Sequence, residues 1–408
     1  MESLRELYKI GRGPSSSHTM GPFKAARQFK KLYPHADAFK VKLMGSLALT
    51  GKGHMTDTVI AEALGEKITE ITFDKAAPTP VHPNTMELTA LKNGEIIGHS
   101  VIYSIGGGSI LTEGQTRAET ETVSIYPHNS FTEIAEYCSH KGIRLPDYVE
   151  EVEGNEIYDY LSDIWLAMED CIGRGIRTRG ELGGGLHLTR KASYLYNQRH
   201  IDESAQTREN RLVCAYAFAV GEENASGGEI VTAPTCGACG VLPAVLKYMQ
   251  EQKGFSDEQV LRALATGGLI GNIIKTNASI SGAECGCQAE IGTACSMAAA
   301  ALAELFGMGI EQIEYSAEVA MEHHLGLTCD PINGLVQIPC IERNAVAAMR
   351  AINALSLANF LTSMSKIPFD TVVKTMYETG IHLKSEYRET SEGGLAKHYV
   401  NHCGDPIN

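Results

Sequence analysis

The sequence predicts two domains: an N-terminal α/β (α+β) domain over residues 1–152, and a mostly α-helical domain over residues 158–403. The first reason is length, because 408 residues exceed what one ordinary hydrophobic core holds. The second is charge, because residues 1–150 carry 16 Lys/Arg and 17 Asp/Glu, whereas the remainder carries 19 and 32. The third is the stretch from Leu145 to Gly173, which has nine acidic residues and no basic one. Short β-like runs precede this stretch and helical patterns follow it. We assign residues 404–408 to a C-terminal tail.

In the first domain, short runs of β-forming residues alternate with helical runs and Gly-rich turns. This alternation is typical of α/β or α+β domains. The predicted strands are Phe39–Leu43, Glu70–Phe73 and Val101–Ile105, and the predicted helices are Lys24–Leu32 and Thr58–Leu64.

The second domain is dominated by helical periodicity. Leu161, Ile164, Trp165, Met168 and Ile172 form one apolar stripe, and we expect further helices over Ala294–Phe306 and Asn344–Leu361. Ser256 with Gln259 has the pattern of a capping box, which predicts a helix beginning there. Gly267-Gly268 predicts its end.

Composition excludes some classes of function. The net charge of −14 argues against a nucleic-acid partner, which requires a basic face. No stretch reaches the roughly 18 apolar residues of a membrane helix, and MESLRELYKIGRG has no apolar signal core. We therefore expect a cytoplasmic protein with no nucleic-acid partner and no membrane partner.

Eleven cysteines in a reducing compartment raise the expectation of a metal site. Cys287 lies in a loop-like stretch, Cys329 lies in a turn, and Cys340 begins a helix, where the dipole favours a thiolate. Their intervals of 42 and 11 residues are weak evidence, and buried structural cysteines remain the alternative. Cys236 and Cys239 form a C-x-x-C pair. Such a pair is found in zinc sites and in redox-active sites, and it also occurs without either role.

Two polar segments in the first domain are candidate site elements. Ser15, Ser16, Ser17, His18 and Thr19 precede an apparent helix, and such a turn can bind a carboxylate, although a simple N-cap is the alternative. His54 lies in a flexible polar loop. An imidazole with a pKa near 6.5 suits proton transfer there, and a solvated loop histidine is the alternative.

Several long motifs, in order along nearly the whole chain, resemble the iron–sulfur-dependent L-serine dehydratases of bacteria, in the single-chain form with fused beta-type and alpha-type domains. The motifs are Gly13-Pro-Ser-Ser-Ser-His-Thr19, Gly45-Ser-Leu-Ala-Leu-Thr-Gly-Lys-Gly-His54, Asn277-Ala-Ser-Ile-Ser-Gly-Ala-Glu284, Gly286-Cys-Gln288, Leu325-Gly-Leu-Thr-Cys-Asp-Pro331, Pro339-Cys-Ile-Glu-Arg-Asn344 and Tyr387-Arg-Glu-Thr-Ser391.

The resemblance implies a [4Fe–4S] cluster bound by Cys287, Cys329 and Cys340, with the fourth iron left for L-serine. Cys403 matches a C-terminal cysteine that caps this iron in some members, but five residues follow it here. The resemblance also implies a homodimer, and release of pyruvate and ammonia by a carbon–oxygen lyase.

The remaining site residues are hypotheses built on these motifs. We favour His54 as general base, and His18 next. Ser15, Ser16, Ser17 and Thr19 are candidate substrate-binding residues, which would place the site between the domains. Asn277 and Ser279 are candidate hydrogen-bond donors. Arg343 is a candidate partner of the substrate carboxylate, with a structural ion pair as the alternative.

Two other functions stay open on the sequence. An L-cysteine desulfidase would use the same cluster to remove the substrate thiol, although that class typically lacks the SSSHT domain. A non-catalytic iron–sulfur or redox sensor would bind the metal without turnover.

Overall fold

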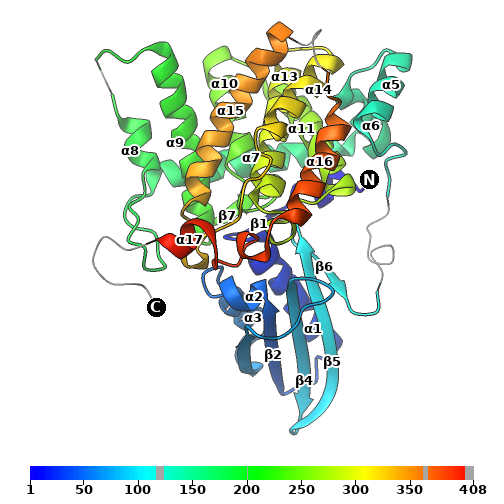
Figure 1. Cartoon of the computed structure of the whole chain (residues 1–408), viewed down its shortest axis with the longest axis vertical. Coiled ribbons are helices and arrows are strands. Elements are labelled where there is room, and N and C mark those ends of the chain that lie inside the picture. Colours follow the sequence, from blue (N-terminus) through cyan, green and yellow to red (C-terminus); the bar gives the residue numbers. More distant parts are fainter. Residues whose placement is uncertain (116–123, 200, 362–365, 400–408) are drawn as a thin grey trace.

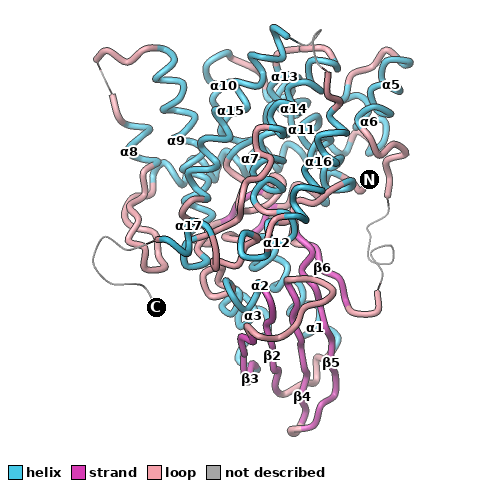
Figure 2. Tube along the Cα trace, viewed as in Figure 1, coloured by secondary structure: helices cyan, strands magenta, loops and turns pink. Residues whose placement is uncertain are grey.

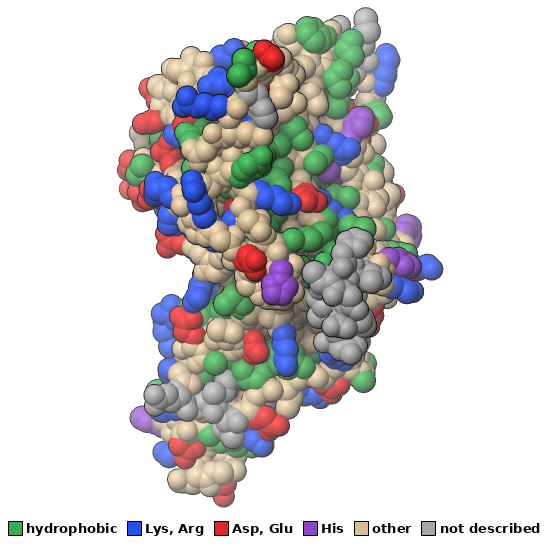
Figure 3. Space-filling view, turned by 90° about the vertical axis from the view of Figure 1, so that its left-hand side faces the viewer, with side chains coloured by type: hydrophobic (Ala, Val, Ile, Leu, Met, Phe, Trp, Pro, Cys, Tyr) green, Lys and Arg blue, Asp and Glu red, His purple; other side chains and the backbone are tan. Residues whose placement is uncertain are grey.

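The computed structural model describes residues 1–115, 124–199, 201–361 and 366–399. A large helical body carries a smaller α/β lobe at one end (Figure 1), and the longer strands all lie in that lobe (Figure 2). The space-filling view shows an indentation along one edge of the molecule, where the two parts meet (Figure 3). The predicted fold class, an α/β domain followed by a mostly helical one, is confirmed.

The smaller lobe is built on a five-stranded sheet with the order β3-β2-β4-β5-β6. Strands β2 and β3 are parallel and the other neighbours are antiparallel. The strands are β2 (Ala38–Gly45), β3 (Ile68–Asp74), β4 (Asn84–Lys92), β5 (Glu95–Gly106) and β6 (Ser109–Thr112). Helices α1 (Gly21–Leu32) and α3 (Thr56–Leu64) pack together and share the core of the sheet. Every strand and helix predicted in this region is present.

The larger body surrounds α13 (Thr293–Leu305), whose residues are all buried. This Ala-rich helix has small side chains on every face, so neighbouring helices approach it closely. Its neighbours are α10 (Val241–Lys253), α11 (Asp257–Asn277), α14 (Ile310–Glu322) and α15 (Cys340–Leu361). The outer helices are α5 (Phe131–Lys141), α6 (Leu145–Glu153), α7 (Glu156–Arg177), α8 (Ala192–Asn197), α9 (Ala205–Ala225) and α16 (Phe369–His382). No helix within the described ranges is both long and apolar enough to cross a membrane.

Short elements occupy the region between the two parts. They are the π-helical turn η2 (Ser16–Met20), α2 (Ser46–Thr50), α12 (Gly282–Cys285), η4 (Gln288–Gly292), η5 (Ile332–Gly334), η7 (Ser385–Tyr387) and α17 (Gly394–His398). Near the N-terminus, η1 (Leu4–Glu6) precedes β1 (Ile10–Arg12), which pairs antiparallel with β7 (Glu229–Val231). Most of the sequence motifs lie in or next to these short elements.

Helix α11 corrects one expectation. Its capping box at Ser256 and Gln259 is present, but the helix continues through Gly267-Gly268 to Asn277. Both glycines are buried, and a Cβ atom on Gly267 would lie 2.9 Å from the carbonyl oxygen of Met297 on α13. The glycines are therefore explained by close packing of helices and not by helix termination.

The two parts of the molecule have separate hydrophobic cores. The core of the smaller lobe draws on residues between Ala25 and Ile102. The core of the larger body includes Leu4 and Tyr8 as well as Phe131 and Val149. The chain thus begins in the larger body, enters the smaller lobe at residues 13–20 and returns after β6.

We expect Gly267→Ala to lower the free energy of unfolding by about 1–3 kcal/mol, because the added methyl group overpacks the contact between α11 and α13. Chemical denaturation of the folded chain measures this change. At an exposed helical site the same substitution is stabilising, so an increase in stability would contradict the packing explanation.

Candidate active site

A buried cavity between the two parts of the molecule is lined by residues from distant segments of the chain. Ser15, Ser16 and His54 come from the N-terminal region. The larger body contributes the three cysteines Cys287, Cys329 and Cys340 together with the carboxylates of Glu290 and Glu389. All eight residues line one cavity, so the structure brings together the principal site residues that the sequence analysis proposed.

The three cysteines are held by different local structures. Cys287 precedes η4, Cys329 forms an isolated β-bridge with Arg388, and Cys340 is the first residue of α15. The Cys329 thiol donates a hydrogen bond to Cys287, and this bond lowers the pKa of Cys287. The pKa of Cys329 is raised by the same hydrogen bond and by burial. Burial raises the pKa of Cys340. In the part of the chain that the structure describes, no fourth cysteine lines this cavity.

Arg343, one turn after Cys340, supports the turn that carries Cys329. Its guanidinium donates to the carbonyl oxygen of Thr328 at 2.6 Å and to Asp330 Oδ1 at 2.9 Å. Its positive charge also helps to lower the pKa of Cys287. The ion pair with Asp330 is the structural alternative that the sequence analysis weighed for Arg343. This residue therefore positions a cysteine turn, and Asp330 already engages its charge.

His54 has a defined tautomer. Its Nδ1 lies 2.9 Å from the carbonyl oxygen of Thr50, which can only accept, so Nδ1 carries the proton and Nε2 of the neutral ring is bare. Burial lowers the pKa of His54 to about 4. The imidazole is therefore neutral at pH 7, and Nε2 is available to accept a proton.

The His18 tautomer follows from a chain of hydrogen bonds. The Ser46 hydroxyl donates to the carbonyl oxygen of Glu389 at 2.7 Å, so it must accept from His18 Nε2 at 3.0 Å. His18 Nδ1 is then bare and accepts from the Ser17 hydroxyl at 2.9 Å. Burial, and then the neighbouring His54, lower the pKa of His18 well below its usual value.

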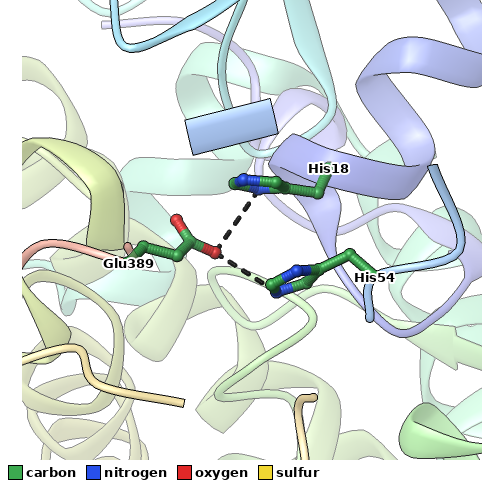
Figure 4. A group of neighbouring side chains, drawn as sticks. All are labelled: His18, His54 and Glu389. Atoms are coloured by element: carbon green, nitrogen blue, oxygen red, sulfur yellow. Dashed lines mark ion pairs between the residues drawn. The ribbon is translucent and has the colours of Figure 1, made fainter. Parts of the chain in front are cut away.

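Glu389 joins the two histidines and was not identified from the sequence. Its Oε1 lies 3.4 Å from His18 Nδ1 and 3.6 Å from His54 Nε2 (Figure 4). The two rings stack with centroids 4.4 Å apart. Burial raises the pKa of Glu389 well above its usual range. Its only sequence signal was its place in the motif Tyr387-Arg-Glu-Thr-Ser391.

A second buried carboxylate, Glu290, was also missed. Its Oε2 accepts from the Thr235 hydroxyl at 2.8 Å, and its Oε1 accepts from the backbone N–H of Gly282 at 3.0 Å. Burial raises the pKa of Glu290. Because both oxygens have partners, this side chain ties the segment before Cys287 to the Cys236–Cys239 segment.

The other candidate site residues named in the sequence analysis do not line the cavity within the described part of the chain. Ser17 and Thr19 do not line the cavity but support it, since Thr19 Oγ1 donates to the carbonyl oxygen of His54 at 2.7 Å. Asn277 and Ser279 are not brought to the cavity: Asn277 donates to the carbonyl oxygen of Asn129, and Ser279 to Glu284. Cys236 and Cys239 are buried beside it without lining it. Cys403 and residues 404–408 lie outside the described residues.

Comparison with known proteins explains why these segments converge. A family model described as the serine dehydratase beta chain matches residues 3–67, and one described as the serine dehydratase alpha chain matches residues 54–396. The second match covers more than half of the chain. The chain belongs to the serine dehydratase family.

Members of the serine dehydratase family with curated names resemble the chain over nearly its full length. The chain is 42% identical to L-serine dehydratase 1 of Escherichia coli K12, over 97% of this chain and 99% of that protein. It is 40% identical to an L-serine dehydratase of Haemophilus influenzae, over 97% and 99%, and 39% identical to one of Streptomyces coelicolor, over 98% and 99%.

The loop that carries His54 packs tightly on the larger body, which makes its position testable. A Cβ atom on Gly53 would lie 2.5 Å from the carbonyl oxygen of Gly334. We expect Gly53→Ala to displace His54 and to lower kcat/KM by about 10- to 100-fold, because small displacements at a reacting centre are costly. Steady-state kinetics measure the change.

Gly183→Ala is the matched control, because a Cβ atom there meets nothing within 4 Å. It should leave kcat/KM unchanged. Equal activity of the Gly53→Ala and Gly183→Ala proteins would show that the docking of this loop does not position His54.

Proposed function

We propose that the protein is an L-serine dehydratase, a carbon–oxygen lyase that converts L-serine to pyruvate and ammonia. Loss of the α-proton and of the β-hydroxyl as water yields 2-aminoacrylate, which becomes the imine and hydrolyses to the two products. The observation that carries the proposal is the single cavity that contains three thiols and the bare Nε2 of His54. The names of the relatives, all L-serine dehydratases, support the same activity.

The donor set of the cavity fits a [4Fe–4S] cluster. Three thiols converge in a buried site beside the cationic Arg343, and thiolates are the usual ligands of such clusters. Cys287, Cys329 and Cys340 would hold the cluster, which leaves one iron without a cysteine from the described chain. When bound, a cluster of this kind supplies a Lewis acid that makes the β-hydroxyl a better leaving group.

The residues of the chain supply the rest of the chemistry. His54 Nε2 removes the α-proton, and the bond from Nδ1 to the Thr50 carbonyl keeps that nitrogen bare. His18 stacks on His54 and is the second candidate. Ser15 and Ser16 line the cavity and are the candidate groups for the substrate carboxylate. The burial of the cavity limits water access, which protects the reactive enamine.

The protein purified without oxygen is expected to release pyruvate from L-serine with a higher kcat/KM than from L-cysteine. His54→Gln should lower kcat by about 10²- to 10⁴-fold, the range for loss of a general base. A coupled pyruvate assay under anaerobic conditions measures both effects.

His140→Gln replaces an exposed histidine on α5 and should keep full activity. Faster turnover of L-cysteine would favour the desulfidase alternative. A protein that binds iron but releases no pyruvate from either substrate would instead indicate a sensor.

A further inference from the structure

We propose that Glu389 binds the α-ammonium group of the substrate and so selects amino acids over hydroxy acids. This inference deepens the proposed function and rests on it. The three thiols, the serine run and His54 account for the β-hydroxyl, the carboxylate and the α-proton, but they offer no anionic partner for the ammonium group. A buried ammonium group requires such a partner, since an unpaired charge is costly in a cavity.

The carboxylate of Glu389 is buried and only partly satisfied. The residue is 4% exposed, and its Oε2 has no hydrogen-bond partner among the described residues. The backbone N–H of Ala283 is the hydrogen-bond donor to this carboxylate. Native proteins seldom leave a buried carboxylate oxygen without a partner, so an open Oε2 beside a substrate cavity indicates a ligand.

Comparison with Glu290 shows that the carboxylate oxygen without a hydrogen-bond partner is specific to Glu389. Both carboxylates line the same cavity. Glu290 has a partner for each oxygen, Thr235 for Oε2 and Gly282 for Oε1. Of these two carboxyl groups, only Glu389 keeps an oxygen without a hydrogen-bond partner that can accept from a cationic group.

The backbone of Glu389 is held in an unusual conformation that fixes the side chain. Its φ is +59°, in the left-handed region that a non-glycine residue seldom adopts. Two hydrogen bonds hold it there: its N–H donates to the carbonyl oxygen of Cys329 at 2.8 Å, and its carbonyl oxygen accepts from Ser46 at 2.7 Å. Strain of this kind is retained mainly where a side chain must be placed for function.

The position also suits the reaction. Glu389 Oε1 lies 3.6 Å from His54 Nε2. An ammonium nitrogen at about 2.8 Å from the carboxylate would bring the adjacent α-carbon close to the bare nitrogen of His54. Binding the amino group would therefore also present the α-proton to its base. The ammonium charge would in turn offset the burial that raises the pKa of Glu389.

The test compares L-alanine with L-lactate, which differ only in the α-ammonium and α-hydroxyl groups and have no β-hydroxyl to eliminate. Anaerobic calorimetry measures their binding to the holoenzyme. The wild type should prefer L-alanine by about 10²-fold or more, the range for one buried charge pair. In Glu389→Gln we expect this preference to fall below about tenfold, whereas Glu392→Gln, an exposed acid in the same segment, keeps it.

A folded Glu389→Gln protein that keeps the wild-type preference would overturn the inference, as would a wild type that binds both acids equally. Glu389→Asp retains the charge and should keep a preference of at least tenfold, so its loss in a folded chain would overturn the inference as well. Pyruvate release from L-serine by the wild type is measured in the same preparation. Its absence would refute the proposed function, whereas turnover with an unchanged preference in Glu389→Gln refutes only the role of Glu389.

Discussion

Cys287, Cys329 and Cys340 share one buried cavity with His54 and Glu389, and none of these groups becomes charged there without a large desolvation cost. The local structure reflects this cost. Burial lowers the pKa values of the imidazoles and raises those of the carboxylates. The neutral forms of these imidazoles and carboxyl groups are therefore favoured until a partner of opposite charge arrives. A cluster that takes up thiolates and a substrate that carries an ammonium group are partners of this kind.

The path of the chain explains how two parts of the molecule supply one site. Leu4 and Tyr8 belong to the core of the larger body, and β1 pairs with β7 of that body. The serine run follows directly, where the chain crosses to the smaller lobe, and His54 lies just after the short helix α2. Ser46 then links this lobe back to Glu389 through a hydrogen bond. The smaller lobe is thus part of the candidate site.

The secondary structure was largely predictable, because periodicity and capping act locally. The strand at Val101–Ile105, the helix at Lys24–Leu32 and the capping box at Ser256 are all present. Gly267-Gly268 was misread as a helix end because its cause is the approach of α13, which no local pattern reveals.

The site was predictable only in part. Intervals of 42 and 11 residues do not show that three cysteines converge, so the resemblance to a family had to supply that step. Asn277 and Ser279 are close to Cys287 in sequence but do not reach the cavity. Glu389 is one acid in a polar segment, and only the tertiary structure shows that it is buried beside two stacked histidines.

The central claim is that three separated thiols form one cluster site, and metal analysis of the protein prepared without oxygen tests it most directly. Iron and acid-labile sulfide are counted in the wild type and in Cys329→Ala under identical conditions. The account predicts about four irons and four sulfides per wild-type chain, and loss of the intact cluster in the variant. A wild type that holds no iron after reconstitution, or a Cys329→Ala protein with the same iron content and absorption spectrum, would contradict it.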